Sequence, residues 1–178
     1  MKTALIVIDV QHHLFDEAPR PEDAAGVIER INALVAGAKQ AGVPVAFVQH
    51  QSESGALMAG TRGWQFADAL AVAPDDTIIA KTTPDSFLRT GLEGWLQQHG
   101  AQSVVICGGM TEFCIDTTTR RAAALGYPVT LAADAHTTHD KTHASAAMIR
   151  AHHNATLPDI GSFGVEIRAV AAGTIAWG

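Results

Sequence analysis

The stretch that decides the fold is SVVICGGMTEFCIDTTTRRAAALG, residues 103–126. It begins with a short, continuous apolar run over residues 103–107, which is typical of a strand buried on both faces of a sheet. A glycine-rich turn follows, and a helix is expected over residues 114–125, with Gly126 as its terminator. A buried strand that leads into a helix is the repeating unit of a parallel α/β sheet.

The same alternation of strand and helix continues on both sides of this stretch. Further strands are expected at residues 4–8, 43–49, 77–80, 128–132 and 165–170. Further helices are expected from Pro21 to the terminator Gly42, over residues 91–99 and over residues 142–157. The series predicts a single three-layer α/β/α domain over residues 1–178, with a mostly parallel, Rossmann-like sheet of about six strands and helices on both faces.

Composition limits the classes of function. Of the 178 residues, 47% are hydrophobic and 17% are charged, which suits a folded core rather than a disordered chain. The formal net charge of -6 would repel phosphate backbones and acidic membrane surfaces, so we expect neither nucleic acid nor membrane as a partner. Two cysteines without zinc-type spacing indicate a reducing compartment, and the short apolar run near the amino terminus is too brief for a signal peptide. We therefore expect a cytoplasmic protein.

Ionisable residues follow three of the expected strands. In an open parallel sheet, ligands gather outside the carboxyl ends of the strands, which is where Asp9, Lys81 and Cys114 are expected. A thiol at a helix N-terminus faces the positive end of the helix dipole and free N–H groups, so we expect a depressed pKa for Cys114. The alternative is a small buried hydrophobe, which is the interpretation that we favour for Cys107.

Asp9 and Lys81 each end an otherwise apolar strand. They are interpreted as an ion pair beside the thiol, in which the carboxylate is able to take the thiol proton as a general base. The alternative is a structural salt bridge. The joint presence of all three side chains at one sheet edge favours a catalytic site.

At these residues the chain resembles the isochorismatase-like cysteine hydrolases. The motifs that carry the resemblance are Ile8-Asp9-Val10-Gln11 with Phe15, Lys81 with Ser86-Phe87, the turn from Gly108 to Cys114, and Asp134-Ala135. The resemblance implies that Asp9 is the general base, Cys114 the nucleophile and Lys81 the cation that tunes both. It also implies an oxyanion hole formed by the backbone N–H groups of Met110 and Cys114, and a cis peptide bond at Gly109-Met110.

The resemblance further implies hydrolysis of a C–N bond in a small amide, carbamoyl or lactam substrate through a covalent thioester, in a homo-oligomer of two or more subunits and without a cofactor. Three alternatives remain: a metal-assisted nicotinamidase-type amidase, an isochorismatase-type vinyl ether hydrolase, and an inactive binding protein on the same fold. Residues 49–53, QHQSE, lack the Asp-x-His of the nicotinamidase metal motif, so no metal is expected.

Residues near the expected strand ends are candidates for contact with the substrate. Trp64 follows Gly60 and Gly63 in the segment after the second strand, where it is interpreted either as part of an aromatic lid or as a local hydrophobic anchor. The histidines of the last long helix are expected on a solvated face. The predicted substrate-binding residues are Gln11, Phe15, His50, Trp64, Phe87, Thr111, Phe113 and His136.

Overall fold

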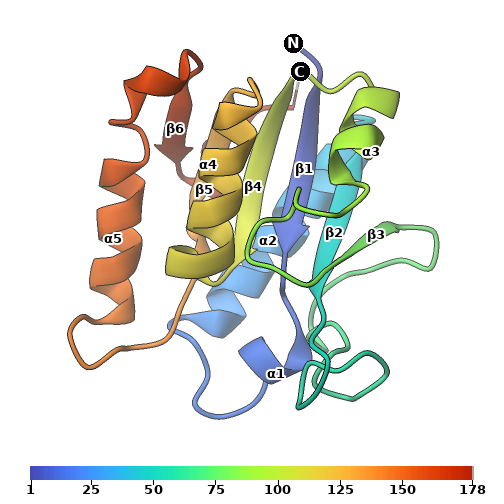
Figure 1. Ribbon diagram of the computed structural model, residues 1–178, viewed down its shortest axis with the longest axis vertical. Helices are drawn as coiled ribbons and strands as arrows, with labels where there is room; N and C mark the ends of the chain where they lie inside the picture. Colours follow the sequence, from blue (N-terminus) through green and yellow to red (C-terminus); the bar gives the residue numbers. More distant parts are fainter. Residues whose placement is uncertain (178) are drawn as a thin grey trace.

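The structure is a computed structural model that describes residues 1–177, and six strands of this part form one parallel sheet (Figure 1). The sheet has the order β3-β2-β1-β4-β5-β6, so the chain moves outward from β1 in one direction and then in the other. The strands are β1 (Thr3–Ile8), β2 (Val45–His50), β3 (Thr77–Lys81), β4 (Ser103–Gly109), β5 (Val129–Thr137) and β6 (Ile167–Val170). This order confirms the predicted α/β class.

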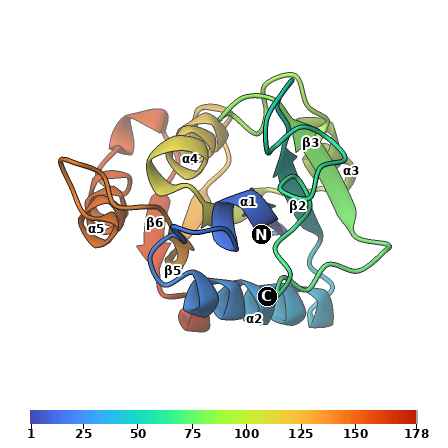
Figure 2. The same cartoon turned by 90° about the horizontal axis from the view of Figure 1, so that it is seen from below.

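Helices cover both faces of the sheet. Figure 2 shows α2 along one face and α3 and α4 on the other, with α5 beside α4. The helical segments are α1 (His12–Phe15), α2 (Ala24–Gln40), α3 (Leu92–Gln98), the π-helical η1 (Thr111–Ile115), α4 (Asp116–Ala124), α5 (Ala146–Thr156), and the 3₁₀ turns η2 (Gly161–Phe163) and η3 (Ala172–Thr174). Among residues 1–177, none of the helices combines the length and apolar character needed to cross a membrane.

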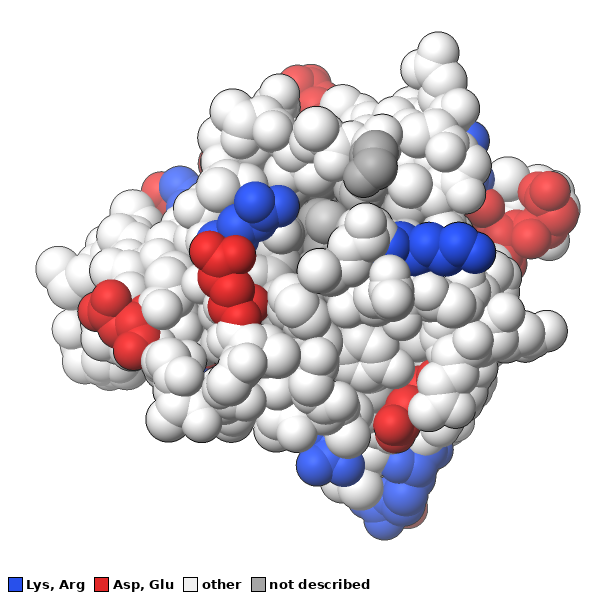
Figure 3. Space-filling view, turned by 90° about the horizontal axis from the view of Figure 1, so that it is seen from above, with Lys and Arg blue, Asp and Glu red and all other residues white. Residues whose placement is uncertain are grey.

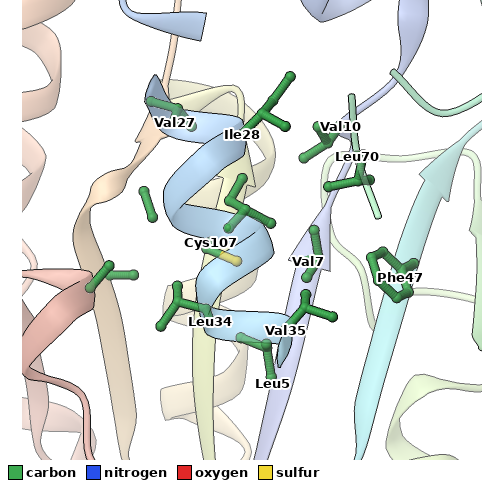
Figure 4. Close-up of a cluster of buried hydrophobic side chains, with 14 of the residues drawn as sticks. Leu5, Val7, Val10, Val27, Ile28, Leu34, Val35, Phe47, Leu70 and Cys107 are labelled. Carbon is green, nitrogen blue, oxygen red and sulfur yellow. The ribbon is translucent and has the colours of Figure 1, made fainter. Parts of the chain in front are cut away.

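Alternate residues of each central strand enter two different cores. Leu5 and Val7 face α2, where they pack with Leu34 and Val35 (Figure 4), whereas Ile6 and Ile8 face the side of α3 and α4. Burial of one such side chain contributes roughly 1.5–3 kcal/mol. Two dry layers therefore hold β1 and β4 rigidly in the centre, and the residues at their carboxyl ends inherit that rigidity.

Two elements differ from the predicted boundaries near the carboxyl edge. The helix expected over residues 114–125 is divided into the π-helical turn η1 and α4, so the helical chain begins before the cysteine. β5 extends to Thr137 because its pairing with β4 shifts register between Ile106 and Gly108, which brings His136 opposite Gly108. Neither a π-helical turn nor a register shift produces a periodic pattern of apolar residues, so the sequence alone could not indicate them.

Figure 3 views the molecule from the end that carries both termini, opposite α1. Lysine, arginine, aspartate and glutamate side chains lie scattered on this face, and no continuous basic patch is visible on it.

Candidate active site

Three buried or half-buried side chains meet at the carboxyl edge of the sheet. Asp9 directly follows β1, Lys81 is the last residue of β3, and Cys114 lies in η1 after β4. Lys81 Nζ is 2.6 Å from Asp9 Oδ2 and 3.2 Å from Cys114 Sγ. The Lys81 and Asp9 side chains are 0% and 1% exposed, so each charge depends on the other for its stability in the dry interior.

Lys81 also contacts two further acceptors. Its Nζ lies 3.0 Å from the carbonyl oxygen of Thr83 and 3.2 Å from His50 Nδ1. An ammonium has three protons and cannot accept, so His50 Nδ1 is the acceptor and the ring proton lies on Nε2. Burial, followed by the charge of Lys81, lowers the pKa of His50, which keeps the ring neutral. Lys81 therefore has four acceptors for three protons.

The backbone at this edge has an unusual shape. Asp9 adopts a left-handed conformation with φ of 53°, which few residues other than glycine adopt. Gly108, with φ of +119°, lies against β1 so closely that a Cβ would meet the Ile8 carbonyl oxygen at 2.0 Å. A glycine is therefore required where β4 passes the residue that precedes Asp9.

The thiol of Cys114 does not have the predicted ionisation. Burial, and next the negative charge of Asp9, raise its pKa to about 12, against the opposing effect of Lys81. The expectation of a depressed pKa was wrong, because the helix-dipole argument omitted desolvation and the carboxylate that faces the sulfur. The resting side chain is a neutral thiol beside a carboxylate and an ammonium.

The turn that leads to Cys114 contains a cis peptide bond between Gly109 and Met110, at the position that the resemblance implied. Met110 is buried, and η1 begins at the next residue, Thr111. The peptide groups on both sides of this bond therefore precede the helical turn that carries the cysteine.

The profile of the isochorismatase domain matches residues 3–159. The chain belongs to the isochorismatase family. Streptothricin hydrolase of Streptomyces noursei is 36% identical over 138 residues, which cover 77% of this chain and 50% of that protein. The chain thus spans about half the length of this relative. YddQ, an isochorismatase family protein of Bacillus subtilis, is 34% identical over 76% of this chain and 77% of its own length.

A crystal structure of an isochorismatase family protein superposes on the chain with a TM-score of 0.86 at 30% sequence identity. The match covers 96% of this chain and 98% of that one. The sheet order and its two helical layers are therefore those of the isochorismatase fold.

Five of the predicted substrate-binding residues are buried in the interior of the protein, and their contact with a substrate stays a prediction. Phe15 and Phe87 are core residues, the first against Gly109 and the second stacked on Tyr127 with ring centroids 6.3 Å apart. Their aromatic character indicated a pocket wall, but the sequence could not show on which side of the backbone each ring lies. The other three, Gln11, Thr111 and His136, are buried polar residues.

The polar groups of these three residues are engaged within the protein. The amide of Gln11 donates to the carbonyl oxygens of His50 and Trp64 and accepts from the His50 N–H, so it clips the end of β2 to the following segment. Thr111 Oγ1 lies 2.8 Å from His136 Nδ1, and His136 Nε2 lies 2.9 Å from Asn154 Oδ1, so both ring nitrogens are engaged. Buried polar groups need such partners, and here they find them inside the fold.

The remaining candidates lie nearer to solvent. Phe113 is half exposed and lines a groove with Met148 and His143, and Lys141 Nζ lies 5.3 Å from its ring centroid. Trp64 is half-buried, and its neighbour Phe66 packs edge-on against Phe47, which supports the local-anchor interpretation for this segment. Sequence reasoning missed Thr83, whose backbone carbonyl holds Lys81 and therefore left no side-chain signal.

The residues beside Lys81 do not fit the metal site of a nicotinamidase-type enzyme. His50 Nδ1 faces an ammonium, which repels a cation, and Glu53 is exposed. Elsewhere in residues 1–177, His12, Asp16 and Asp68 bring ligand atoms within 4.8 Å of one another. Asp68 pairs with Arg62, and Asp16 accepts the Asp68 N–H, so both carboxylates are engaged and the group carries no assignment.

Proposed function

We propose that the protein is a cysteine hydrolase that cleaves the C–N bond of a small amide, carbamoyl or lactam substrate through a thioester. The observation that carries the proposal is the convergence of Asp9, Lys81 and Cys114, with Lys81 Nζ 2.6 Å from the carboxylate and 3.2 Å from the sulfur. The family supports a hydrolase, and the relative named streptothricin hydrolase acts on the compound in its name.

The raised thiol pKa assigns Asp9 its part in the first step. Because Cys114 rests as a thiol, attack on the substrate carbonyl requires a base, and Asp9 is the carboxylate that faces the sulfur. The S–H proton moves to Asp9 as the sulfur–carbon bond forms, and the carbonyl electron pair becomes an oxyanion. The backbone N–H groups of Met110 and Cys114 are proposed to stabilise that oxyanion.

Collapse of the oxyanion breaks the C–N bond. The proton held by Asp9 passes to the leaving nitrogen, so an amine departs and a thioester to Cys114 remains. Water then gives a proton to Asp9 and attacks the thioester carbon; the acid leaves as the carbon–sulfur bond breaks, and the sulfur regains the proton. Lys81 remains charged throughout and offsets the negative charge that alternates between Asp9 and the sulfur.

The nucleophile separates this proposal from the vinyl ether alternative. Hydrolysis of a vinyl ether needs acid catalysis only, whereas a half-buried thiol beside a base is useful for attack on a carbonyl carbon. Burial of the charges of Lys81 and Asp9 is unfavourable, and a non-catalytic binding protein would have no need of this buried pair.

The test is an activity screen over small amides, ureido and carbamoyl acids and lactams, with nicotinamide included. We expect turnover of at least one compound by the native protein and none by the Cys114→Ala variant. After acid quenching of the native reaction, the peptide that contains Cys114 should show an increase in mass. Hydrolysis by Cys114→Ala at the native rate would overturn the covalent mechanism. Turnover of nicotinamide that disappears with a chelator would favour the metal-assisted alternative.

A further inference from the structure

We propose that His136 is a positioning residue. It links Asn154 of α5 to Thr111 through two hydrogen bonds of defined direction, and so holds the turn that leads to Cys114. This inference rests on the proposed hydrolase function, since it concerns the placement of Cys114 and of the backbone groups beside it. His136 itself is fully buried, and both of its ring nitrogens lie within hydrogen-bond distance of protein side chains.

The direction of each hydrogen bond in this series follows from the first one, in which Asn154 is the donor. Asn154 Nδ2 donates to the Ala133 carbonyl oxygen at 2.9 Å, so the other amide atom, Oδ1, is the one 2.9 Å from His136 Nε2. An amide oxygen only accepts, and His136 therefore carries its proton on Nε2. Nδ1 is left as an acceptor, 2.8 Å from Thr111 Oγ1, and the Thr111 hydroxyl must donate to it.

The charges around His136 leave this arrangement as the stable one at neutral pH. Arg150 and His153 approach from α5 and Asp134 from β5 itself, and Arg150 is paired with Glu22 at 3.3 Å. Burial is the dominant influence and lowers the pKa of His136 to about 4. The ring is therefore neutral, with a single tautomer that the Asn154 amide selects.

The position of Thr111 explains why this direction matters. Thr111 is the first residue of η1, which carries Cys114, and it directly follows Met110, whose N–H is proposed for the oxyanion. The backbone is held at the same place, because Gly108 and Gly109 of β4 pair with His136 and Thr137 of β5. Side-chain and main-chain contacts from β5 thus converge on the turn between β4 and the nucleophile.

A purely structural role would require only that the space be filled, so the test compares isosteric and conservative variants of Thr111. Thr111→Val keeps the shape and removes the donor, whereas Thr111→Ser keeps the donor. We expect kcat to fall about 10- to 100-fold in Thr111→Val with KM changed by less than about twofold, and Thr111→Ser to recover most of the loss. Thr119→Val, at a buried threonine of α4 whose hydroxyl has no hydrogen-bond partner, is the matched control and should keep the native kcat.

A second variant tests the direction of the hydrogen bonds from Asn154 through His136 to Thr111. In Asn154→Asp the carboxylate favours protonated His136, which raises its pKa toward neutrality; the protonated ring then points an N–H at Thr111 and reverses that hydrogen bond. We expect kcat of Asn154→Asp to fall as the pH drops through this raised pKa, in a step that the native protein lacks above about pH 4. A flat profile over that range would overturn the inference.

Hydrogen exchange gives a readout that needs no substrate. In Thr111→Val we expect the amides of residues 110–115 to exchange at least about tenfold faster than in the native protein, while those of β1 and α2 keep their rates. Native kcat and native exchange in Thr111→Val would overturn the inference and leave the proposed function intact if Cys114→Ala is inactive. Full activity of Cys114→Ala would instead overturn the proposed function, whatever the result at Thr111.

Discussion

The two cysteines lie on the same strand-and-turn unit yet have opposite surroundings. Cys107 is wholly buried in the core beneath α2 (Figure 4), and the nearest polar partner of its sulfur is the Ile6 carbonyl oxygen at 3.8 Å. Cys114 packs against the other core and has Lys81 at 3.2 Å and the charge of Asp9 beside it. Burial raises the pKa of both thiols, so ionisation at rest does not distinguish them.

What distinguishes them is the presence of a proton acceptor and a countercharge. A buried thiol without a base stays inert, as Cys107 should. Cys114 has a carboxylate that can take its proton and an ammonium that stabilises the resulting thiolate. In the proposed mechanism, the reactivity of Cys114 therefore depends on charged neighbours that follow or end other strands, β1 and β3, rather than on the helix that carries the cysteine.

The largest expected effect separates the two thiols directly. Cys114→Ala should lower kcat by about 10⁴-fold or more, because the covalent intermediate can no longer form. Cys107→Ala should leave kcat within about twofold of the native value, since no step involves that sulfur. Both are measured by steady-state kinetics on the substrate found in the screen; equal losses in the two variants would break the comparison.

Removal of the base, Asp9, should have opposite effects on ionisation of the Cys114 thiol and on turnover. In Asp9→Asn the loss of the negative charge lowers the pKa of Cys114, so alkylation by iodoacetamide at pH 8 should become faster at Cys114 and stay slow at Cys107. Turnover should nevertheless fall by about 10²- to 10⁴-fold, because no group remains to accept and return the proton. Peptide mass spectrometry gives the alkylation rates, and slower labelling of Cys114 in Asp9→Asn would contradict the assignment.

The cation should matter for stability as well as for chemistry. Lys81→Met leaves Asp9 buried without its partner, which should lower the free energy of unfolding by about 3–5 kcal/mol in urea titrations. The double variant Asp9→Asn/Lys81→Met should recover part of that stability and none of the turnover. If the double variant is less stable than Lys81→Met, the pair is not the buried ion pair that the geometry indicates.

The buried histidine of β5, His136, should add a pH dependence of its own. His136 has a pKa of about 4 in the folded protein against 6.5 when unperturbed, so the unfolded chain binds a proton first as the pH falls. The stability that neutral His136 contributes should be fully present above pH 6.5. It should decrease by roughly 3 kcal/mol in total as the pH falls toward 4, and below that pH this group should cause no further change. The contribution is isolated by subtracting the pH profile of unfolding of a His136→Asn variant.

The smallest effect concerns the inert thiol. Cys107→Ala removes one buried sulfur from a packed layer and should lower the free energy of unfolding by about 1 kcal/mol. Cys107→Val, which fills the space, should cost less. A larger loss in Cys107→Val would indicate that the site has no room for a second methyl group.

The sequence was sufficient to predict the sheet and to place Asp9, Lys81 and Cys114 at its carboxyl edge. Strand ends in a parallel sheet are fixed by topology, and topology follows from the alternation of apolar runs and helical patterns. The four-residue helix α1 was not predicted, because it is too short to display a period.

Side-chain surroundings were less accessible to sequence reasoning. The inward position of His136 depends on a register shift between β4 and β5, and the raised pKa of Cys114 depends first on burial and next on a carboxylate more than one hundred residues earlier in the chain. Both are consequences of three-dimensional packing. Residue types at the strand ends identified where chemistry is expected, but they could not show which polar groups are already satisfied inside the protein.

The close approach of Gly108 to Ile8 sets a limit on how this protein can change. With 2.0 Å between a hypothetical Cβ and the Ile8 carbonyl oxygen, any side chain at position 108 would force β4 away from β1 and so widen the gap between base and nucleophile. In a library that randomises residues 108–115, active clones should vary at the exposed Phe113 and retain glycine at 108. Within this one turn, the protein can therefore vary at an exposed position and is fixed at the position where β4 meets β1.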